Sequence, residues 1–436
     1  MLRRLPLRGL ATSRCVCKEW LATVDGRRLL RPELLPRSVR GIFLSYSERN
    51  YPAFLSHPSM EPDIFGELNF HRLPGQWNRA DVLGHCNGLL LYIDMQGLHV
   101  ANPATRWRAS LPPPPPPPPG KFDVLPHLVF DPTESPHYEV LVVPESPTML
   151  EWDEPSKEWP PSTWVLCALS SRTGQWEERV FVREGQAAGM DTDVALHWSN
   201  VFGQNCSAYW QGALFVQCNG GFTVMRISLL DNKYRVIKMP TDMGKGEYCD
   251  VYLGRSKEGL CCASFHHLCK LRVWILDDSG GMIEWVLKHH IDIYNSVSPV
   301  RRNFEEDGGS WILEDADSGE HQNLQDVNKD KALARSKVEW DSDNDDIVDD
   351  ESNVVQSYIG YIKILGFHPF KDAIFLDLSQ HKTVAYHLNT SMVHVLGRSR
   401  PDNYSSDAAS ITSSFPYTSC LIADFPEDKL EAHAKV

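Results

Sequence analysis

The sequence has no long apolar stretch. A run of about 18 apolar residues, which a membrane-spanning helix needs, does not occur. The charged start, residues 1–6, is not followed by the apolar segment of a secretory signal peptide. We therefore expect the eleven cysteines to be reduced thiols, and the protein to reside in the cytoplasm, the nucleus or both, with no membrane partner.

Catalytic and cofactor-binding motifs are missing too. The sequence contains no Gly-x-Ser-x-Gly elbow, no phosphate-binding loop and no dinucleotide fingerprint. One metal-like group lies where two strands meet, and strand alternation would send its neighbouring residues to opposite faces. That group is Cys261, Cys262, His266, His267 and Cys269. We therefore predict no enzymatic activity, no catalytic residues, no cofactor and no metal site.

Positive charge is scarce outside the N-terminal part. The formal net charge is −14, but residues 1–40 hold ten Arg or Lys against three acids. The remaining body offers no basic face for phosphates, so no nucleic-acid partner is expected. An Arg-rich, acid-poor start also suits a mitochondrial transit peptide, an alternative that Pro6 disfavours.

Two segments interrupt the body of the chain. The proline run 112–119 predicts an extended polyproline II loop, either a spacer or a ligand for a proline-binding domain. An acidic stretch near 302–356 predicts a disordered loop, because it combines self-repulsion with few apolar residues. Asp341, Asp343 and Asp345 are spaced as in a calcium loop, but the Gly and Glu that such a loop requires are absent.

Apolar periodicity divides the chain into two parts. Residues 1–40 space their apolar side chains as a helix does, and Asp25 and Gly26 mark a stop. From Gly41 onward one β unit recurs: a small residue, an apolar strand, a polar turn, a second strand and a third that is aromatic or apolar. Its turn-plus-aromatic sites fall at Trp107, Trp176, Tyr234 and Trp285.

These sites are about 50 to 70 residues apart, the spacing of kelch-like propeller blades with variable loops. We therefore predict a mainly β fold: a kelch-like β-propeller of about six to eight blades, preceded by a short helical segment. The propeller is expected to cover residues 41–425 and to be followed by a tail, 426–436.

The residues also resemble a known family. Residues 2–20 look like the second half of an F-box, and the body resembles the F-box-associated β-propeller of grass F-box proteins, over nearly the whole chain. The stretches that carry the resemblance of the body include His85–Leu91, Asn102–Thr105, Phe130–Pro132, Ser171–Glu177, Leu271–Trp274 and Ile364–Pro369.

The resemblance implies a substrate receptor of a ubiquitin ligase. An F-box binds a Skp-type adaptor, and through it a cullin, by an apolar helical surface, while the propeller binds a protein target whose identity the sequence does not give. The matching adaptor-binding positions are Leu5, Pro6, Leu7, Leu10, Arg14, Val16, Cys17 and Trp20. The same apolar residues also suit the core of a small helical domain.

Two other functions stay open at this point. The family's F-box opens with about ten further residues that this sequence does not contain, which favours an interaction scaffold that no longer joins a ligase. A propeller enzyme would instead require a convergent polar or metal site at the central channel.

Overall fold

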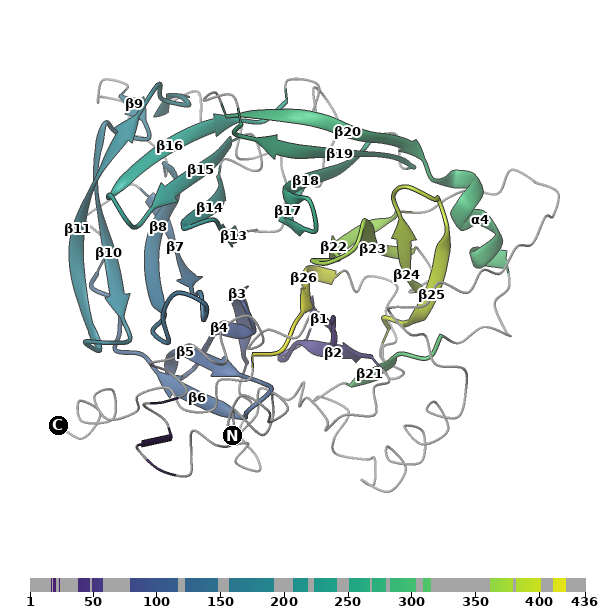
Figure 1. Cartoon of the computed structure of the whole chain (residues 1–436), viewed down its shortest axis with the longest axis horizontal. Coiled ribbons are helices and arrows are strands. Elements are labelled where there is room, and N and C mark those ends of the chain that lie inside the picture. The colour runs from purple at the N-terminus through teal and green to yellow at the C-terminus, as the bar shows by residue number, and fades with distance from the viewer. Residues whose placement is uncertain are drawn as a thin grey trace.

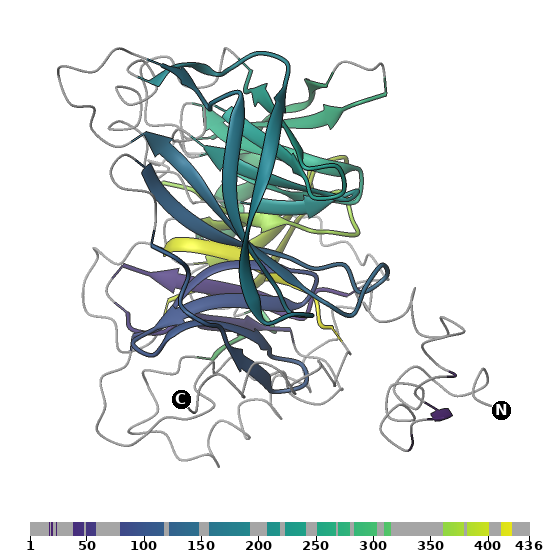
Figure 2. The ribbon, with the colours of Figure 1, turned by 90° about the vertical axis from the view of Figure 1, so that its left-hand side faces the viewer.

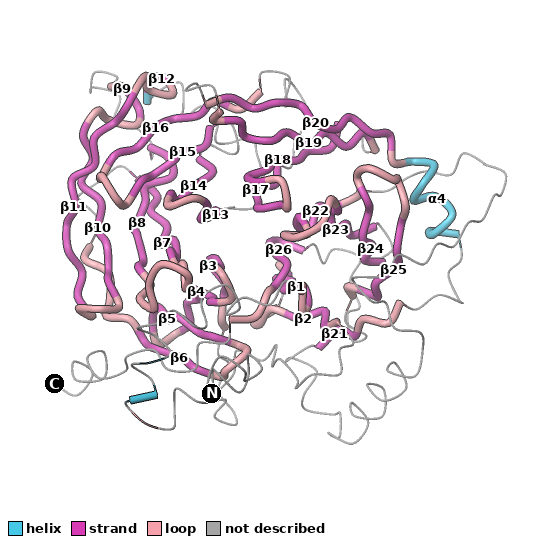
Figure 3. Tube along the Cα trace, viewed as in Figure 1, coloured by secondary structure: helices cyan, strands magenta, loops and turns pink. Residues whose placement is uncertain are grey.

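The computed structural model describes seventeen segments of the chain, and Figures 1 and 3 draw the rest in grey. They are residues 17, 19–20, 23, 38–47, 49–57, 79–116, 122–147, 157–191, 207–218, 223–240, 251–266, 269–279, 283–302, 309–314, 361–378, 382–400 and 411–420. Strands dominate these segments, and a short helix, α4 (Tyr294–Arg302), follows one of them. The mainly β prediction is therefore confirmed.

Five groups of four antiparallel strands each come from one continuous region of the chain, and only β9 (Glu158–Trp159) interrupts the order in one of them. Sheet I contains β3 (Asp81–Cys86), β4 (Leu89–Asp94), β5 (Gly97–Asn102) and β6 (Trp107–Ser110). Sheet II contains β7 (Phe122–Val129), β8 (Glu139–Pro147), β10 (Thr163–Ser170) and β11 (Gln175–Glu184). Sheet III contains β13 (Ser207–Trp210), β14 (Ala213–Cys218), β15 (Thr223–Ser228) and β16 (Lys233–Lys238).

The next two sheets follow the same plan. Sheet IV contains β17 (Val251–Ser256), β18 (Gly259–His266), β19 (Lys270–Asp277) and β20 (Glu284–Asp292). Sheet V contains β22 (Lys363–Phe367), β23 (Ala373–Leu378), β24 (Lys382–His387) and β25 (Val393–Arg398). A separate pair joins β9 (Glu158–Trp159) to β12 (Gly189–Met190).

Sheets II and III are continuous with each other at their outer edges. Residues Val182–Glu184 of β11 pair in parallel with Lys233–Arg235 of β16, so the two form one eight-stranded sheet. Parallel strands need a crossover connection, which the chain provides between residues 184 and 233.

A sixth sheet, here called the closing sheet, is assembled from three distant parts of the chain. Its strands, in spatial order, are β21 (Ile312–Glu314), β2 (Ala53–Ser56), β1 (Gly41–Tyr46) and β26 (Ile411–Tyr417). The C-terminal strand β26 lies alongside β1 in Figure 2, with Phe43 opposite Phe415. The first and last described strands of the body are thereby joined.

Apolar clusters fill every junction between consecutive sheets, and so close the ring. One cluster joins sheets I and II through Leu91, Phe130 and Tyr138, and another joins sheets II and III through Phe181 and Met225. The largest cluster spans sheets III, IV and V. Two more place the closing sheet between sheets V and I. The described strands thus form a propeller-like ring of antiparallel sheets, in which sheets II and III are joined into one eight-stranded sheet.

Burial falls from the middle of each sheet to its outer edge. The second strands are almost wholly buried, as in β14 and β18, because sheets cover both of their faces. The outer strands β11 and β20 are mostly exposed. The continuous apolar runs of the second strands and the mixed sequences of the outer strands follow from this radial packing.

Two parts of the fold differ from what the sequence predicted. Periodicity did not identify the innermost strands β3, β13, β17 and β22, which are short and contain glycine or polar residues. Within the stretch expected to be a disordered loop, residues 312–314 form β21 of the closing sheet, beside the buried Trp311. A single buried tryptophan and three paired residues order this short segment despite its acidic surroundings.

The structure describes only part of the predicted proline loop and none of the predicted tail. Pro112–Pro116 lie in neither helix nor strand, and Pro113–Pro116 are exposed, while 117–119 lie outside the described residues. The tail 426–436 also lies outside them. In the described part of the chain, no helix has both the length and the apolar character needed to cross a bilayer.

Candidate functional site

A cavity of about 150 Å³ lies on the axis of the ring. Its walls come from the innermost strands of five sheets, β3, β13, β17, β22 and β26, which surround the middle of Figure 1. A side chain added at Gly84 would meet no atom within 4 Å, so this glycine leaves space in the wall. The site therefore exists only when the ring is closed.

A tight turn connects β3, the innermost strand of sheet I, to β4. Asn87 and Gly88, between β3 and β4, both have positive φ (45° and 87°), which is the conformation that an Asn-Gly hairpin turn requires. A Cβ on Gly88 would lie 2.5 Å from the backbone nitrogen of Cys420, so only glycine fits there. The turn thus places the Asn87 side chain at the rim of the cavity.

The polar groups of the cavity include one cation, Arg255, at the end of β17. Its Nη1 donates a hydrogen bond of 3.5 Å to Oδ1 of Asn87, and the Arg255 side chain is exposed. Asn87 in turn donates from Nδ2 to the carbonyl oxygen of Phe130 at 2.7 Å. None of the described residues that line the cavity is an aspartate or a glutamate.

Burial keeps three ionisable wall residues neutral at ordinary pH. His85 stacks on Phe415 at 4.1 Å between ring centroids, and burial lowers its pKa to about 4. Burial also raises the pKa of Cys86 to about 12 and that of Tyr209 to about 12. The carboxylate of Asp131, outside the lining, adds to both of these increases.

Two acids close to Arg255 in sheets IV and V line a separate, smaller cavity and have partners there. Asp372 accepts from Lys257 at 3.5 Å, and Glu258 forms an ion pair with Lys288 at 3.4 Å. Among the described residues, Arg255 forms no ion pair. The cavity therefore offers an exposed guanidinium beside several aromatic rings, an arrangement that suits an anionic ligand.

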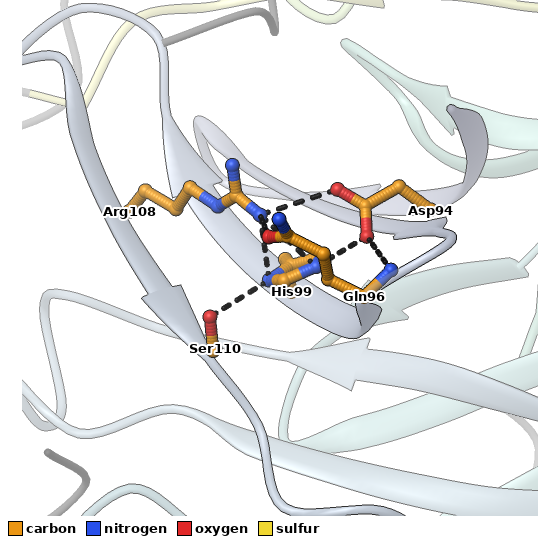
Figure 4. Close-up of polar contacts among 5 residues, drawn as sticks. All are labelled: Asp94, Gln96, His99, Arg108 and Ser110. Atoms are coloured by element: carbon orange, nitrogen blue, oxygen red, sulfur yellow. Dashed lines mark hydrogen bonds and ion pairs between the residues drawn. The ribbon is translucent and has the colours of Figure 1, made fainter. Parts of the chain in front are cut away.

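A second polar cluster lies across the outer three strands of sheet I (Figure 4). His99 Nε2 lies 2.8 Å from Asp94 Oδ1, and His99 Nδ1 lies 3.1 Å from Ser110 Oγ. Arg108 Nη2 contacts both ring nitrogens, at 3.1 and 3.0 Å, and forms an ion pair with Asp94. Gln96 completes the group by donating its backbone N–H to Asp94.

The sheet I cluster contains the residue types of a hydrolase triad, but its chemistry is structural. Burial is the main cause of the lowered pKa of His99, which the Asp94 hydrogen bond only partly opposes. Both ring nitrogens are already occupied, the ring stacks on Tyr92 at 5.0 Å, and the side chain is 1% exposed. A substrate cannot reach this histidine, so the cluster ties β4, β5 and β6 together.

The adaptor-binding candidates and the metal-like Cys and His group do not form a site among the described residues. Of the adaptor-binding candidates, Cys17 and Trp20 are described, and both are exposed. Leu5, Pro6, Leu7, Leu10, Arg14 and Val16 lie outside the described residues. Cys261 and Cys262 are buried and pair with different residues of β19, and His267 is not described. Within the described segments, no group of three His, Cys, Asp or Glu is arranged to hold a metal ion.

Sequence reasoning missed the cavity residues Asn87, Tyr209, Arg255 and Phe370. The signal available for one of them was the Asn-Gly turn before the apolar strand 89–94. Arg255 had no such signal, because only ring closure brings it to Asn87, 168 residues away.

Comparison with known proteins identifies no family. No family profile matches the chain, and no curated protein matches its sequence. A solved structure described as "YCF48 bound to D1 peptide" has 9% identity and a TM-score of 0.33, covering 83% of this chain and 82% of that one. A structure from an analysis of two prolyl endopeptidases has 10% identity and a TM-score of 0.30, covering 89% of this chain and 54% of that one. Such low similarity carries no argument about function.

Proposed function

We propose that the chain is the substrate-recognition subunit of a cullin-type ubiquitin ligase. In this proposal the F-box-like residues 2–20 form a helical segment that binds a Skp-type adaptor, and the propeller binds a protein target. The observation that carries it is the exposure of Trp20, which is 40% accessible. A tryptophan that served only the core of a small domain would be buried, whereas exposed Trp is enriched at protein interfaces.

The chain itself makes and breaks no covalent bond in this proposal. It holds the target near the charged conjugating enzyme, so that ubiquitin transfer gains from high effective concentration. The sheet I cluster is consistent with this non-enzymatic role, because its histidine has no free nitrogen. The proposed complex works in the cytoplasm, the nucleus or both.

The test is affinity capture of the full-length chain with measurement of co-purified adaptor and cullin. The wild-type chain should retain both, and Trp20→Ala should reduce adaptor recovery about tenfold or more, since interface tryptophans contribute strongly. Met95→Ala is the matched control, because Met95 is 79% exposed on sheet I and should leave recovery unchanged.

Two outcomes would reject the ligase proposal. Failure of the wild-type chain to retain any adaptor is one, and equal recovery with Trp20→Ala is the other. Target proteins captured by the propeller without adaptor would instead assign the chain as an interaction scaffold.

A further inference from the structure

The charge of the axial cavity is unbalanced. Arg255 lines it, whereas no described lining residue is an acid. Asp372 and Glu258 pair with Lys257 and Lys288, and Asp131, whose charge acts on Cys86 and Tyr209 of the wall, lies outside the lining. A guanidinium that has only an amide partner, at 3.5 Å, keeps most of its five N–H donors for a ligand.

Asn87 holds this guanidinium at the rim of the cavity. Its Oδ1 accepts from Arg255, and its Nδ2 is fixed by the Phe130 carbonyl. The positive φ of Asn87 comes from the turn into β4, so its side chain is positioned by the backbone of sheet I. Arg255, from sheet IV, is thereby held by a residue on the other side of the channel.

Several aromatic rings line the cavity, and its volume is small. Tyr209, Tyr252, Phe370 and the stacked pair of His85 and Phe415 line it. A volume of about 150 Å³ is less than that of sites which enclose a whole small-molecule ligand, roughly 300–1,000 Å³. The space suits one side chain or one chain terminus, with the rest of the ligand outside.

We propose that this cavity binds a peptide carboxylate, either a C-terminal one or that of an Asp or Glu side chain. Arg255 pairs with the carboxylate, and the aromatic walls pack against the apolar atoms next to it. The inference rests on the proposed function and deepens it, since it gives the chemical class of the contact through which the propeller holds its target.

The test uses the purified full-length chain on peptide arrays. One array varies the last two residues over all the common amino acids, with each peptide present as the free acid and as the amide. A second array carries internal Asp or Glu, with Asn or Gln counterparts and amidated ends. Binding that requires the free acid identifies a C-terminal carboxylate, and binding that requires internal Asp or Glu identifies a side-chain carboxylate.

Substitutions at and near the cavity test whether Arg255 binds the carboxylate. Arg255→Gln should weaken the best peptides about tenfold or more, as expected for a charge-assisted hydrogen bond. Lys257→Gln is the matched control and should have little effect, because Lys257 is already paired with Asp372. Asp131→Asn removes a nearby negative charge and keeps the acceptor for Thr133, so it should tighten binding.

The proposal is overturned if no peptide binds, if amides and free acids bind alike while internal acids add nothing, or if Arg255→Gln has no effect. Weaker binding by Asp131→Asn would indicate a cationic ligand, and this result would also reject the carboxylate proposal. These results are independent of adaptor capture, because the arrays contain no ligase component. Loss of the adaptor with intact carboxylate binding would reject only the ligase role.

Discussion

Sheet I and the closing sheet both have four strands, but they are assembled in opposite ways. The strands of sheet I come from residues 81–110 and pair through short turns. The closing sheet draws on residues 41–56, 312–314 and 411–417. Bringing such distant strands together costs loop-closure entropy before any contact forms. The difference shows that the ring, and the axial cavity with it, depends on its least local sheet.

The closing sheet compensates with an aromatic core. Phe43 lies 4.6 Å from Phe54, 5.3 Å from Phe415 and 5.5 Å from Tyr417 between ring centroids. The hydroxyl of Tyr417 also donates to the carbonyl of Gly88, which links the closing sheet to sheet I. Sheet I, by contrast, is tied across its outer strands by the polar cluster around His99.

The largest expected effect comes from Phe43→Ala. This substitution removes a ring that is 1% exposed and contacts aromatic rings on two other strands, so it should lower the free energy of unfolding by about 3–5 kcal/mol. Hydrogen exchange should accelerate first in residues 41–46 and 411–417, because β1 and β26 separate before the other sheets unfold. Denaturant unfolding and exchange followed by mass spectrometry measure the two effects.

Phe215→Ala is the control variant, because it removes a buried ring from a sheet that one continuous region of the chain forms. Phe215 is 2% exposed in β14 of sheet III, so the loss of stability should be similar. The local increase in exchange should then stay within sheets III to V, which share the cluster around Phe215, and leave the closing sheet unchanged. Early exchange in the closing sheet of this variant would show that the closing sheet is not the weakest part of the ring.

Asp377, in sheet V, should make stability depend on pH. Its carboxylate accepts a hydrogen bond from Ser399, whose carbonyl accepts one from Tyr46 of the closing sheet. Burial raises the Asp377 pKa from 3.8 to about 7, and the Ser399 hydrogen bond and the Lys363 charge oppose that increase only in part. The folded state therefore binds this proton more tightly than the unfolded state does.

The stabilising contribution of protonated Asp377 is complete below pH 3.8 and is lost as the pH rises through about 7. Asp377→Asn should remove this dependence, and its stability relative to wild type should rise by up to about 4 kcal/mol between these limits. Denaturation measured at several pH values tests the difference. A constant difference across the range would contradict the burial of the acid.

The contrast between strands that pair locally and strands that pair over long distances also explains what the sequence could predict. The second strands, such as β14 with its run Ala213–Val216, are mostly apolar because both faces are covered, and they were found. The innermost strands were missed, because a strand that lines a channel, such as β13, has neither an apolar run nor a clear alternation. The pairing of Gly41 with Tyr417 has no local signal at all.

The candidate site was the least predictable feature for the same reason. The missed cavity residues Asn87, Tyr209, Arg255 and Phe370 come from four different sheets, so none forms a motif with another along the chain. Asn87 could be placed in a turn, but the contact with Arg255 depends on the relative position of sheets I and IV. That position is set by the apolar junctions between all the sheets.

His99→Ala should have a smaller effect than the changes above. It leaves Asp94 and Ser110 without their histidine partner, and the free energy of unfolding should fall by about 1–3 kcal/mol. Ser110→Ala should cost less, because Ser110 is exposed. Neither change should alter peptide binding at Arg255. An effect on binding without any loss of stability would show that the cluster is functional and not structural.

The smallest effect is expected where sheets II and III join. Lys233 and Glu184 form an exposed ion pair of 2.8 Å beside the parallel strands, and such pairs contribute little. Lys233→Gln should leave the denaturation midpoint unchanged at physiological salt. Val182→Pro should lower it, because Pro removes the N–H that donates to the Asn232 carbonyl at 3.0 Å. Equal losses in the two variants would show that side-chain charge, not the backbone ladder, joins these sheets.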